Sequence, residues 1–201
     1  MAADLSVRLA WPADAPGMAA AQWATWSQRA ATADGLDLDA TGIDRGALTS
    51  AWTTSLTRPP TARHRVLVAL DRASVVGFVL CAPGTDPDLD PARDGELAEL
   101  TVHPDHRGVG HGSRLVQAAV DTLVADGFTR AVVWVEGSDD RLRAFLASAG
   151  WEPDGASREL ALEDDAAPAA EAGTERAPSG RLKQIRLLAA IGTGGAADEH
   201  G

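Results

Sequence analysis

The chain has 201 residues, 45% of them hydrophobic, which is enough to bury a sizeable core in a single domain. Its formal net charge of -11 argues against nucleic acid and anionic membrane surfaces as partners, because both are held by clustered Lys and Arg side chains. The single cysteine, Cys81, excludes an intrachain disulfide and a cysteine-rich zinc site.

The hydrophobic pattern switches between helical and strand periods along the chain. The predicted elements, in chain order, are a strand at 7–10, helices at 15–31 and 44–56, strands at 64–70, 74–82 and 97–102, a helix at 110–125, a strand at 131–135, a helix at 139–149 and strands at 157–163 and 182–189. The strand, helix, strand order from 97 to 135 predicts a parallel crossover pair. Cys81 falls in the apolar run at 74–82, so we expect a buried thiol.

The segment at 164–180, rich in Ala, Pro, Gly and acidic residues, interrupts the last predicted strand pair. Such a composition cannot bury enough apolar surface to become ordered. We predict a single domain over residues 1–190, with a disordered insertion at 164–180 in the terminal hairpin and a disordered tail at 191–201. The sequence shows neither a secretory signal nor a membrane-spanning stretch, so we expect a cytoplasmic location.

Three glycines, Gly108, Gly110 and Gly112, stand between the strand at 97–102 and the helix at 110–125. A helix that begins after such a turn presents unpaired N–H groups and the positive end of its dipole, and phosphate is the natural occupant. The two equal gaps exclude the dinucleotide fingerprint G-x-G-x-x-G, and no Gly-Lys-Ser/Thr follows as in a Walker motif. On spacing alone, glycines that only let the helix pack closely on the sheet are an alternative.

The stretch Arg107-x-x-Gly110-x-Gly112, preceded by ELAELTVHPDH, resembles motif A of the GNAT N-acetyltransferases, whose signature is [QR]-x-x-G-x-[GA]. The later stretch VEGSDDRLRAFLASAGWEPDG is similar to the family's next segment, in which a short helix ends in Gly-aromatic, here Gly150-Trp151. The order of the predicted elements matches as well. The resemblance covers about residues 5–190 and implies an α/β fold, with a central mixed, twisted sheet and helices on both faces.

The resemblance implies an N-acetyltransferase that moves an acetyl group from acetyl-CoA directly to a primary amine of an unidentified small-molecule acceptor. We expect no metal, and the charge argues against nucleic acid and membrane partners; a homodimer is left open. The Leu100 N–H is expected to polarise the thioester carbonyl and stabilise the oxyanion. The implied cofactor-binding residues are Leu100, Thr101, Val102, Arg107, Gly108, Val109, Gly110, His111, Gly112, Ser113 and Asp139.

Two glutamates are candidates for the general base that deprotonates the amine. Glu96 lies six positions before Val102, where the histone acetyltransferase branch of the family carries its base, and Glu99 is the second candidate. His103 and His106 are interpreted as loop or phosphate-rim residues.

The chain departs from the family pattern where many members carry a Tyr that protonates the departing thiolate. The corresponding pair here is Phe145-Leu146, and the chain contains no Tyr. Water then has to serve as the acid, or the chain is a non-catalytic module that binds acyl-CoA, which is the alternative hypothesis.

Overall fold

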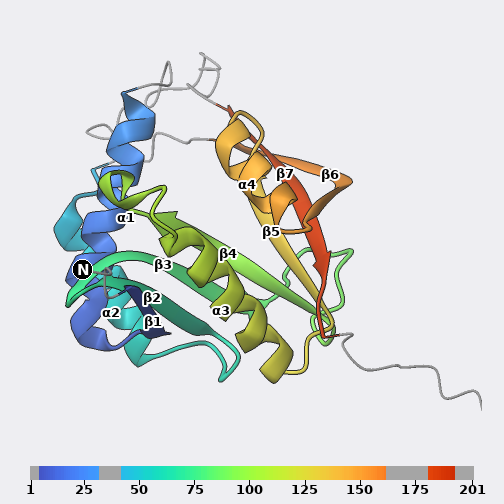
Figure 1. Cartoon of the computed structure of the whole chain (residues 1–201), viewed down its shortest axis with the longest axis horizontal. Coiled ribbons are helices and arrows are strands. Elements are labelled where there is room, and N and C mark those ends of the chain that lie inside the picture. Colours follow the sequence, from blue (N-terminus) through green and yellow to red (C-terminus); the bar gives the residue numbers. More distant parts are fainter. Residues whose placement is uncertain (1–4, 32–41, 162–180, 193–201) are drawn as a thin grey trace, which may run out of the picture.

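The computed structural model describes residues 5–31, 42–161 and 181–192, and a mixed sheet with the strand order β1-β2-β3-β4-β5-β7-β6 forms its centre (Figure 1). The strands are β1 (Leu5–Leu9), β2 (Arg65–Asp71), β3 (Ser74–Pro83), β4 (Asp94–Val102), β5 (Arg130–Glu136), β6 (Glu152–Ala161) and β7 (Arg181–Ala190). The helices are α1 (Ala15–Ala30), α2 (Arg45–Thr57), α3 (His111–Ala125) and α4 (Asp140–Ser148), with short 3-10 turns η1 (Pro12–Asp14) and η3 (Pro104–His106).

Helices cover both faces of the sheet, as the sequence predicts. On one face, α1 and α2 pack around Phe78, whose ring meets Trp52 edge to face with 4.8 Å between the ring centroids. On the other face, Leu115, Ala119 and Leu123 of α3 enter the larger hydrophobic cluster and are fully buried. Within the described residues, no helix is long and apolar enough to cross a membrane.

The strands β4 and β5 form the predicted parallel crossover pair, but they are paired over only three positions, from Asp94–Arg130 to Glu96–Val132. Figure 1 shows the two strands meeting at one end and separating toward the other. At the joined end, the buried Asp94 carboxylate accepts two hydrogen bonds from the Arg130 guanidinium, at 2.7 and 2.6 Å. Beyond Glu96, no pairing between these strands is present in the described chain, so their backbone groups face a gap.

A β-bulge at Ala98 changes the direction of the side chains along β4. Cys81 of β3 pairs with Leu97 and Leu80 pairs with Glu99, which leaves Ala98 without a partner on β3. Residues three apart on a regular strand point to opposite faces, whereas the extra residue places Glu96 and Glu99 on the same face. That face is the one covered by α1 and α2, because Leu80, opposite Glu99, packs there.

Several boundaries differ from those predicted. β4 begins at Asp94 instead of residue 97, and β6 begins at Glu152 instead of residue 157, because polar side chains at both starts hide the strand pattern. The predicted insertion at 164–180 lies outside the described residues, as does the predicted tail from residue 193 onward. Ile191 is buried in the core and its N–H donates to the Thr129 carbonyl, so the packed chain extends at least one residue beyond the predicted boundary at 190.

The last strand, β7, is inserted between β5 and β6 and completes the core with the buried side chain of Leu187. Its first residue, Arg181, pairs directly with Ala161 at the end of β6. The two chain ends that flank residues 162–180 are therefore close enough for a short turn.

Replacing residues 162–180 with Asn-Gly should change the melting temperature of the chain by no more than a few degrees. The entropic cost of closing a loop falls by only about 0.6 kcal/mol each time the loop length is halved. A chain that ends at residue 163 should instead melt at a clearly lower temperature, since β5 and β6 lose their shared neighbour. Thermal denaturation followed by circular dichroism measures both. Equal melting temperatures for the truncated and full chains would contradict the position of β7.

Candidate functional site

A cavity of about 380 Å³ lies between the diverged part of β4, the start of α3 and the first turns of α4. Its lining residues are Arg29, Leu100, Val102, Arg107, Gly108, Gly110, Gly112, Ser113, Asp139, Arg141, Leu142 and Phe145. Most of the residues predicted to bind the cofactor are therefore brought together in one cavity. Three of them lie outside the lining: Thr101, Val109 and His111.

The glycine turn leaves the start of α3 open to this cavity. Gly108 and Gly110 have φ values of 81° and 99°, a region that favours glycine. Gly110 is the N-cap of α3 and supplies no capping side chain, so the first N–H groups of the helix are available to a ligand. A Cβ at Gly112 would lie 3.7 Å from the Phe145 ring, which is ordinary contact, so this position tolerates a small side chain.

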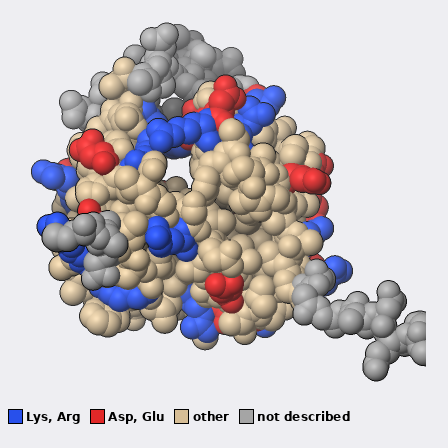
Figure 2. Space-filling model, viewed as in Figure 1, with Lys and Arg blue, Asp and Glu red and all other residues tan. Residues whose placement is uncertain are grey.

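Three arginines, Arg29, Arg107 and Arg141, line the same cavity. Figure 2 shows basic side chains gathered beside a hollow on this face of the molecule. The Nε of Arg107 donates to the Val102 carbonyl at 3.0 Å, which fixes its guanidinium beside the glycine turn. Burial lowers the pKa of the Arg107 guanidinium and the charge of Arg141 lowers it further, against the attraction of Asp139. Such a cluster of partly buried cations at a helix N-terminus suits a polyanionic ligand.

Asp139 has a local role that accounts for its position in the cavity wall. It is the N-cap of α4, and its Oδ1 accepts a hydrogen bond of 2.9 Å from the Leu142 N–H. Its Oδ2 lies 3.7 Å from Arg29 at the end of α1. Asp139 therefore connects α4 to α1 across the open end of the gap.

The backbone of β4 presents Leu100 to the gap. The Thr101 carbonyl faces β3, where a Cβ on Gly77 would come within 2.7 Å of it. The Val102 carbonyl points the other way, since it accepts from Arg107. Because backbone groups alternate along a strand, the Leu100 N–H points to the same side as Val102, away from β3 and toward the gap left by β5.

Glu99 lies beside the cavity, on the α1 and α2 face of β4. The Thr101 hydroxyl donates to its Oε1 at 3.0 Å. Burial raises the pKa of the Glu99 carboxyl, against the effects of the Thr101 hydrogen bond and the charge of Arg29. Arg29 and the next residue along β4, Leu100, both line the cavity, so Glu99 adjoins the cavity wall.

Glu96 is 7% exposed and lies in a different environment. Burial raises the pKa of its carboxyl and the charge of Asp86 raises it further, against the charge of Arg158 and a hydrogen bond from the Thr85 N–H. None of these neighbours lines the cavity. The two glutamates therefore lie on the same face of β4 but in different environments, and only Glu99 adjoins the cavity.

The surroundings of Glu96 form a polar network that the sequence analysis did not anticipate. Arg186 of β7 is 5% exposed and donates to Asp88 at 2.8 Å and to Asp154 at 2.7 Å. Trp134 of β5 donates its Nε1 proton to Asp86 at 2.8 Å, and the Arg158 guanidinium stacks 4.3 Å from the centroid of this ring. These contacts tie the loop between β3 and β4 to the sheet beside Glu96.

Other side chains with reactive groups are accounted for by packing. Cys81 is fully buried, and burial raises the pKa of its thiol to about 12, so the predicted buried thiol is confirmed and cannot serve as a nucleophile. Leu146, at the position where many family members carry Tyr, is fully buried in the core. The side chain of Phe145 takes its place in the cavity wall.

The sequence analysis missed Arg29, Arg141, Leu142 and Phe145 as lining residues. Arg141 and Leu142 lie within the segment that resembles the family, two and three positions after Asp139, so their places could have been found from the start of that helix. Arg29 carries no such local signal, because only the packing of α1 brings it to the gap.

The chain matches the model of the acetyltransferase (GNAT) family over residues 34–151. It is 36% identical over 88 residues to a mycothiol acetyltransferase of Mycobacterium sp. strain JLS, a match that covers 44% of this chain and 26% of that protein. The chain therefore matches about a quarter of the length of this curated relative.

Two solved structures share the fold at low sequence identity. The putative acetyltransferase yncA from Salmonella typhimurium, solved with acetyl-CoA, has a TM-score of 0.60 at 17% identity and covers 98% of this chain and 99% of its own. PaiA N-acetyltransferase from Thermoplasma acidophilum, solved with coenzyme A, has a TM-score of 0.62 at 11% identity and covers 94% and 99%. These two likenesses concern the fold. The match to the family model covers more than half of the residues, and it shows that the chain belongs to the acetyltransferase (GNAT) family.

Proposed function

We propose that the chain is an acetyl-CoA-dependent N-acetyltransferase. The observation that carries this proposal is the cavity itself, in which an uncapped helix N-terminus and three arginines lie beside the unpaired backbone of β4. Phosphate groups suit the first part and an extended pantetheine arm suits the second. The two related structures were solved with acetyl-CoA and with coenzyme A, which supports this choice of ligand.

In the proposed complex, the first N–H groups of α3 bind the pyrophosphate, with Arg107 and Arg141 beside it. The pantetheine arm lies along Leu100 and Val102 in the gap that β5 would otherwise fill. The Leu100 N–H donates to the thioester oxygen and stabilises the negative charge that develops there as the amine attacks. The new C–N bond forms as the C–S bond breaks, and CoA leaves as a thiolate.

We propose that Glu99 is the general base, which accepts a proton from the ammonium group before the amine attacks. Its carboxyl is next to Leu100 and close to Arg29 of the cavity wall, and burial brings its pKa toward the range of an effective general base. Glu96, which the sequence analysis placed first, lies within the Asp86 and Arg158 network instead. A thiolate is a good leaving group, so water supplies the last proton in a chain without Tyr.

We propose a primary amine on a small molecule as the acceptor. Glu99 points to the face covered by α1 and α2, opposite α3, so the amine would reach the thioester from that side. A carboxylate beside the cavity favours a cationic group. The alternative, a module that binds acyl-CoA without catalysis, draws support from the buried Leu146 in place of a Tyr.

The anion cradle can be tested with Gly112. Gly112→Glu places a carboxylate against the bound pyrophosphate and should weaken CoA binding at least about 100-fold, the loss of two charge-assisted hydrogen bonds of roughly 1.5–3 kcal/mol each. Isothermal titration calorimetry with CoA measures the change.

Two matched variants serve as controls for this substitution. Gly112→Ala fits beside Phe145, and Gln117→Glu adds the same charge on the exposed side of α3, so both should bind CoA within a few-fold of the unmodified chain. Unchanged CoA affinity in a folded Gly112→Glu chain would show that the pyrophosphate does not bind at this site.

The base can be tested by turnover with a panel of primary amines, followed as CoA thiol release. Glu99→Gln keeps the shape and the hydrogen bond from Thr101 but removes the basic oxygen, so turnover should fall by about 10²–10⁴-fold while CoA affinity stays the same. Glu96→Gln should have a smaller effect. The reverse order would assign the proton to Glu96, and tight CoA binding without turnover of any amine would favour the non-catalytic alternative.

Glu99→Gln should lower turnover but raise the stability of the fold at neutral pH. Because the folded-state pKa of Glu99 is raised, the native chain binds more protons than the unfolded chain between the two pKa values, and stability falls as pH rises through that window. Glu99→Gln removes this loss, so it should be more stable than the unmodified chain at neutral pH and equally stable below about pH 4. A loss of stability at neutral pH would show that the turnover effect comes from damage to the fold.

A further inference from the structure

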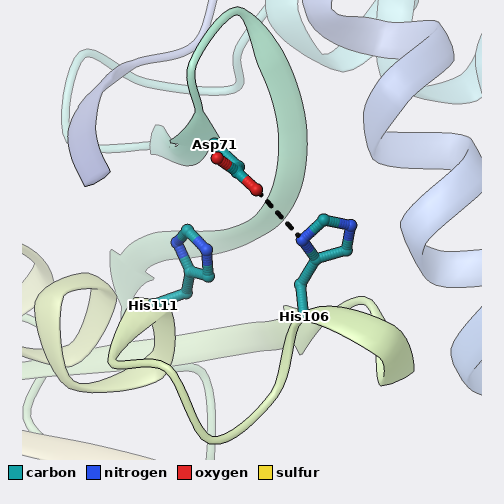
Figure 3. A group of neighbouring side chains, drawn as sticks. All are labelled: Asp71, His106 and His111. Atoms are coloured by element: carbon teal, nitrogen blue, oxygen red, sulfur yellow. Dashed lines mark ion pairs between the residues drawn. The ribbon is translucent and has the colours of Figure 1, made fainter. Parts of the chain in front are cut away.

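Three side chains outside the cavity converge on one point: Asp71, His106 and His111 (Figure 3). Asp71 ends β2, His106 lies in η3 and His111 is the first residue of α3. One ligand atom from each lies within 4.8 Å of the other two. Elements separated by more than thirty residues therefore bring two imidazoles and a carboxylate together.

His111 is the unusual member of this group. It is 2% exposed, and within the described chain neither of its ring nitrogens has a hydrogen-bond partner. Leaving a buried polar atom unpaired costs roughly 1–3 kcal/mol, so native structures seldom do so without a reason. Figure 3 shows the His111 ring between α3 and Asp71, on the side of the turn where His106 lies. One ring nitrogen of His111 thus lies within 4.8 Å of a ligand atom of Asp71 and of His106.

The three side chains offer donor atoms that suit a transition metal. Burial lowers the pKa of the His111 imidazole, against the charge of Asp71. Two nitrogen donors and one carboxylate oxygen form a ligand set that zinc and its neighbours in the first transition series prefer. Magnesium and calcium prefer sites made only of oxygen donors.

We propose that Asp71, His106 and His111 bind a divalent transition-metal ion of the zinc class, with water completing the coordination. The sequence analysis expected no metal and interpreted His106 as a loop or phosphate-rim residue.

The distances allow this with small side-chain movements. Tetrahedral zinc with bonds of about 2.0–2.1 Å holds its ligand atoms roughly 3.3 Å apart. Nδ1 of His106 and Oδ2 of Asp71 are already 3.5 Å apart. The side chains of both are 36% exposed, so they can rotate toward the fixed His111 ring and still leave the ion one side open to water.

The proposed ion would connect three parts of the fold that meet at the glycine turn. His106 and His111 flank Arg107, Gly108 and Gly110, and Asp71 belongs to the β2–β3 hairpin beneath them. Since His111 does not line the cavity, the ion would hold the shape of the turn and would take no part in acetyl transfer.

The test is a calorimetric titration of the tag-free, chelator-treated full chain with Zn²⁺. We expect one equivalent to bind, and His106→Ala and Asp71→Asn each to weaken binding at least about tenfold, since each removes a direct ligand. Mg²⁺ at the same concentration should neither bind nor compete. Both substituted positions are partly exposed, so these variants should remain folded.

One histidine variant serves as a control. His64→Ala, on a side chain that bonds Thr61 elsewhere on the surface, should bind Zn²⁺ as the unmodified chain does. His64 and His200 remain in both ligand variants, so zinc held by them would be unaffected. Absence of Zn²⁺ binding, or equal affinity in the unmodified, His106→Ala and Asp71→Asn chains, would overturn the site.

A spectroscopic measurement tests whether the buried His111 is a metal ligand. Co²⁺ in place of Zn²⁺ should give the visible absorption of a low-coordinate site in the unmodified chain, and this band should be absent with His111→Gln. A band of equal intensity in a folded His111→Gln chain would remove this residue from the ligand set and overturn the proposal.

Discussion

The short parallel contact between β4 and β5 is the constraint on which the cavity depends. At Gly95, a Cβ would lie 2.6 Å from Leu123 and 3.0 Å from Phe128, so glycine lets the end of α3 press against the sheet where the strands join. The Asp94–Arg130 pair fixes this joined end. After three paired positions the strands separate, and the backbone of β4 keeps unpaired groups that water or a ligand has to satisfy. The α3 N-terminus lies at the open end of the same gap.

The bulge at Ala98 places apolar side chains of β4 on one face of the sheet and two glutamates on the other. Leu97, Leu100 and Val102 contact the core on the α3 side, while Glu96 and Glu99 point to the other side. A ligand in the gap would therefore meet the backbone of Leu100 from one face and the carboxylate of Glu99 from the opposite face. This separation lets the two substrates of a direct transfer approach from different sides, which the proposed mechanism requires.

Features with a local signal could be predicted from the sequence. The element order, the crossover and the glycine turn follow from periodicity and from conformational limits on single residues, and the structure agrees with them. Arg29, the bulge at Ala98 and the Arg186 network could not be predicted, because each depends on contacts between distant segments. The start of β4 was placed too late for the same reason: Asp94 and Glu96 are polar residues that become buried only through partners on β5 and in the β3–β4 loop.

The central claim is that the glycine turn and its arginines bind the phosphates of CoA. Calorimetric titration of the full chain with CoA and with pantetheine, which has no phosphate groups, tests it most directly. The account predicts that CoA binds at least about 100-fold more tightly than pantetheine, because the phosphates add two or more charge-assisted hydrogen bonds of roughly 1.5–3 kcal/mol each. Added salt should reduce the difference between the two affinities. Equal affinities for CoA and pantetheine, or no binding of CoA, would contradict it.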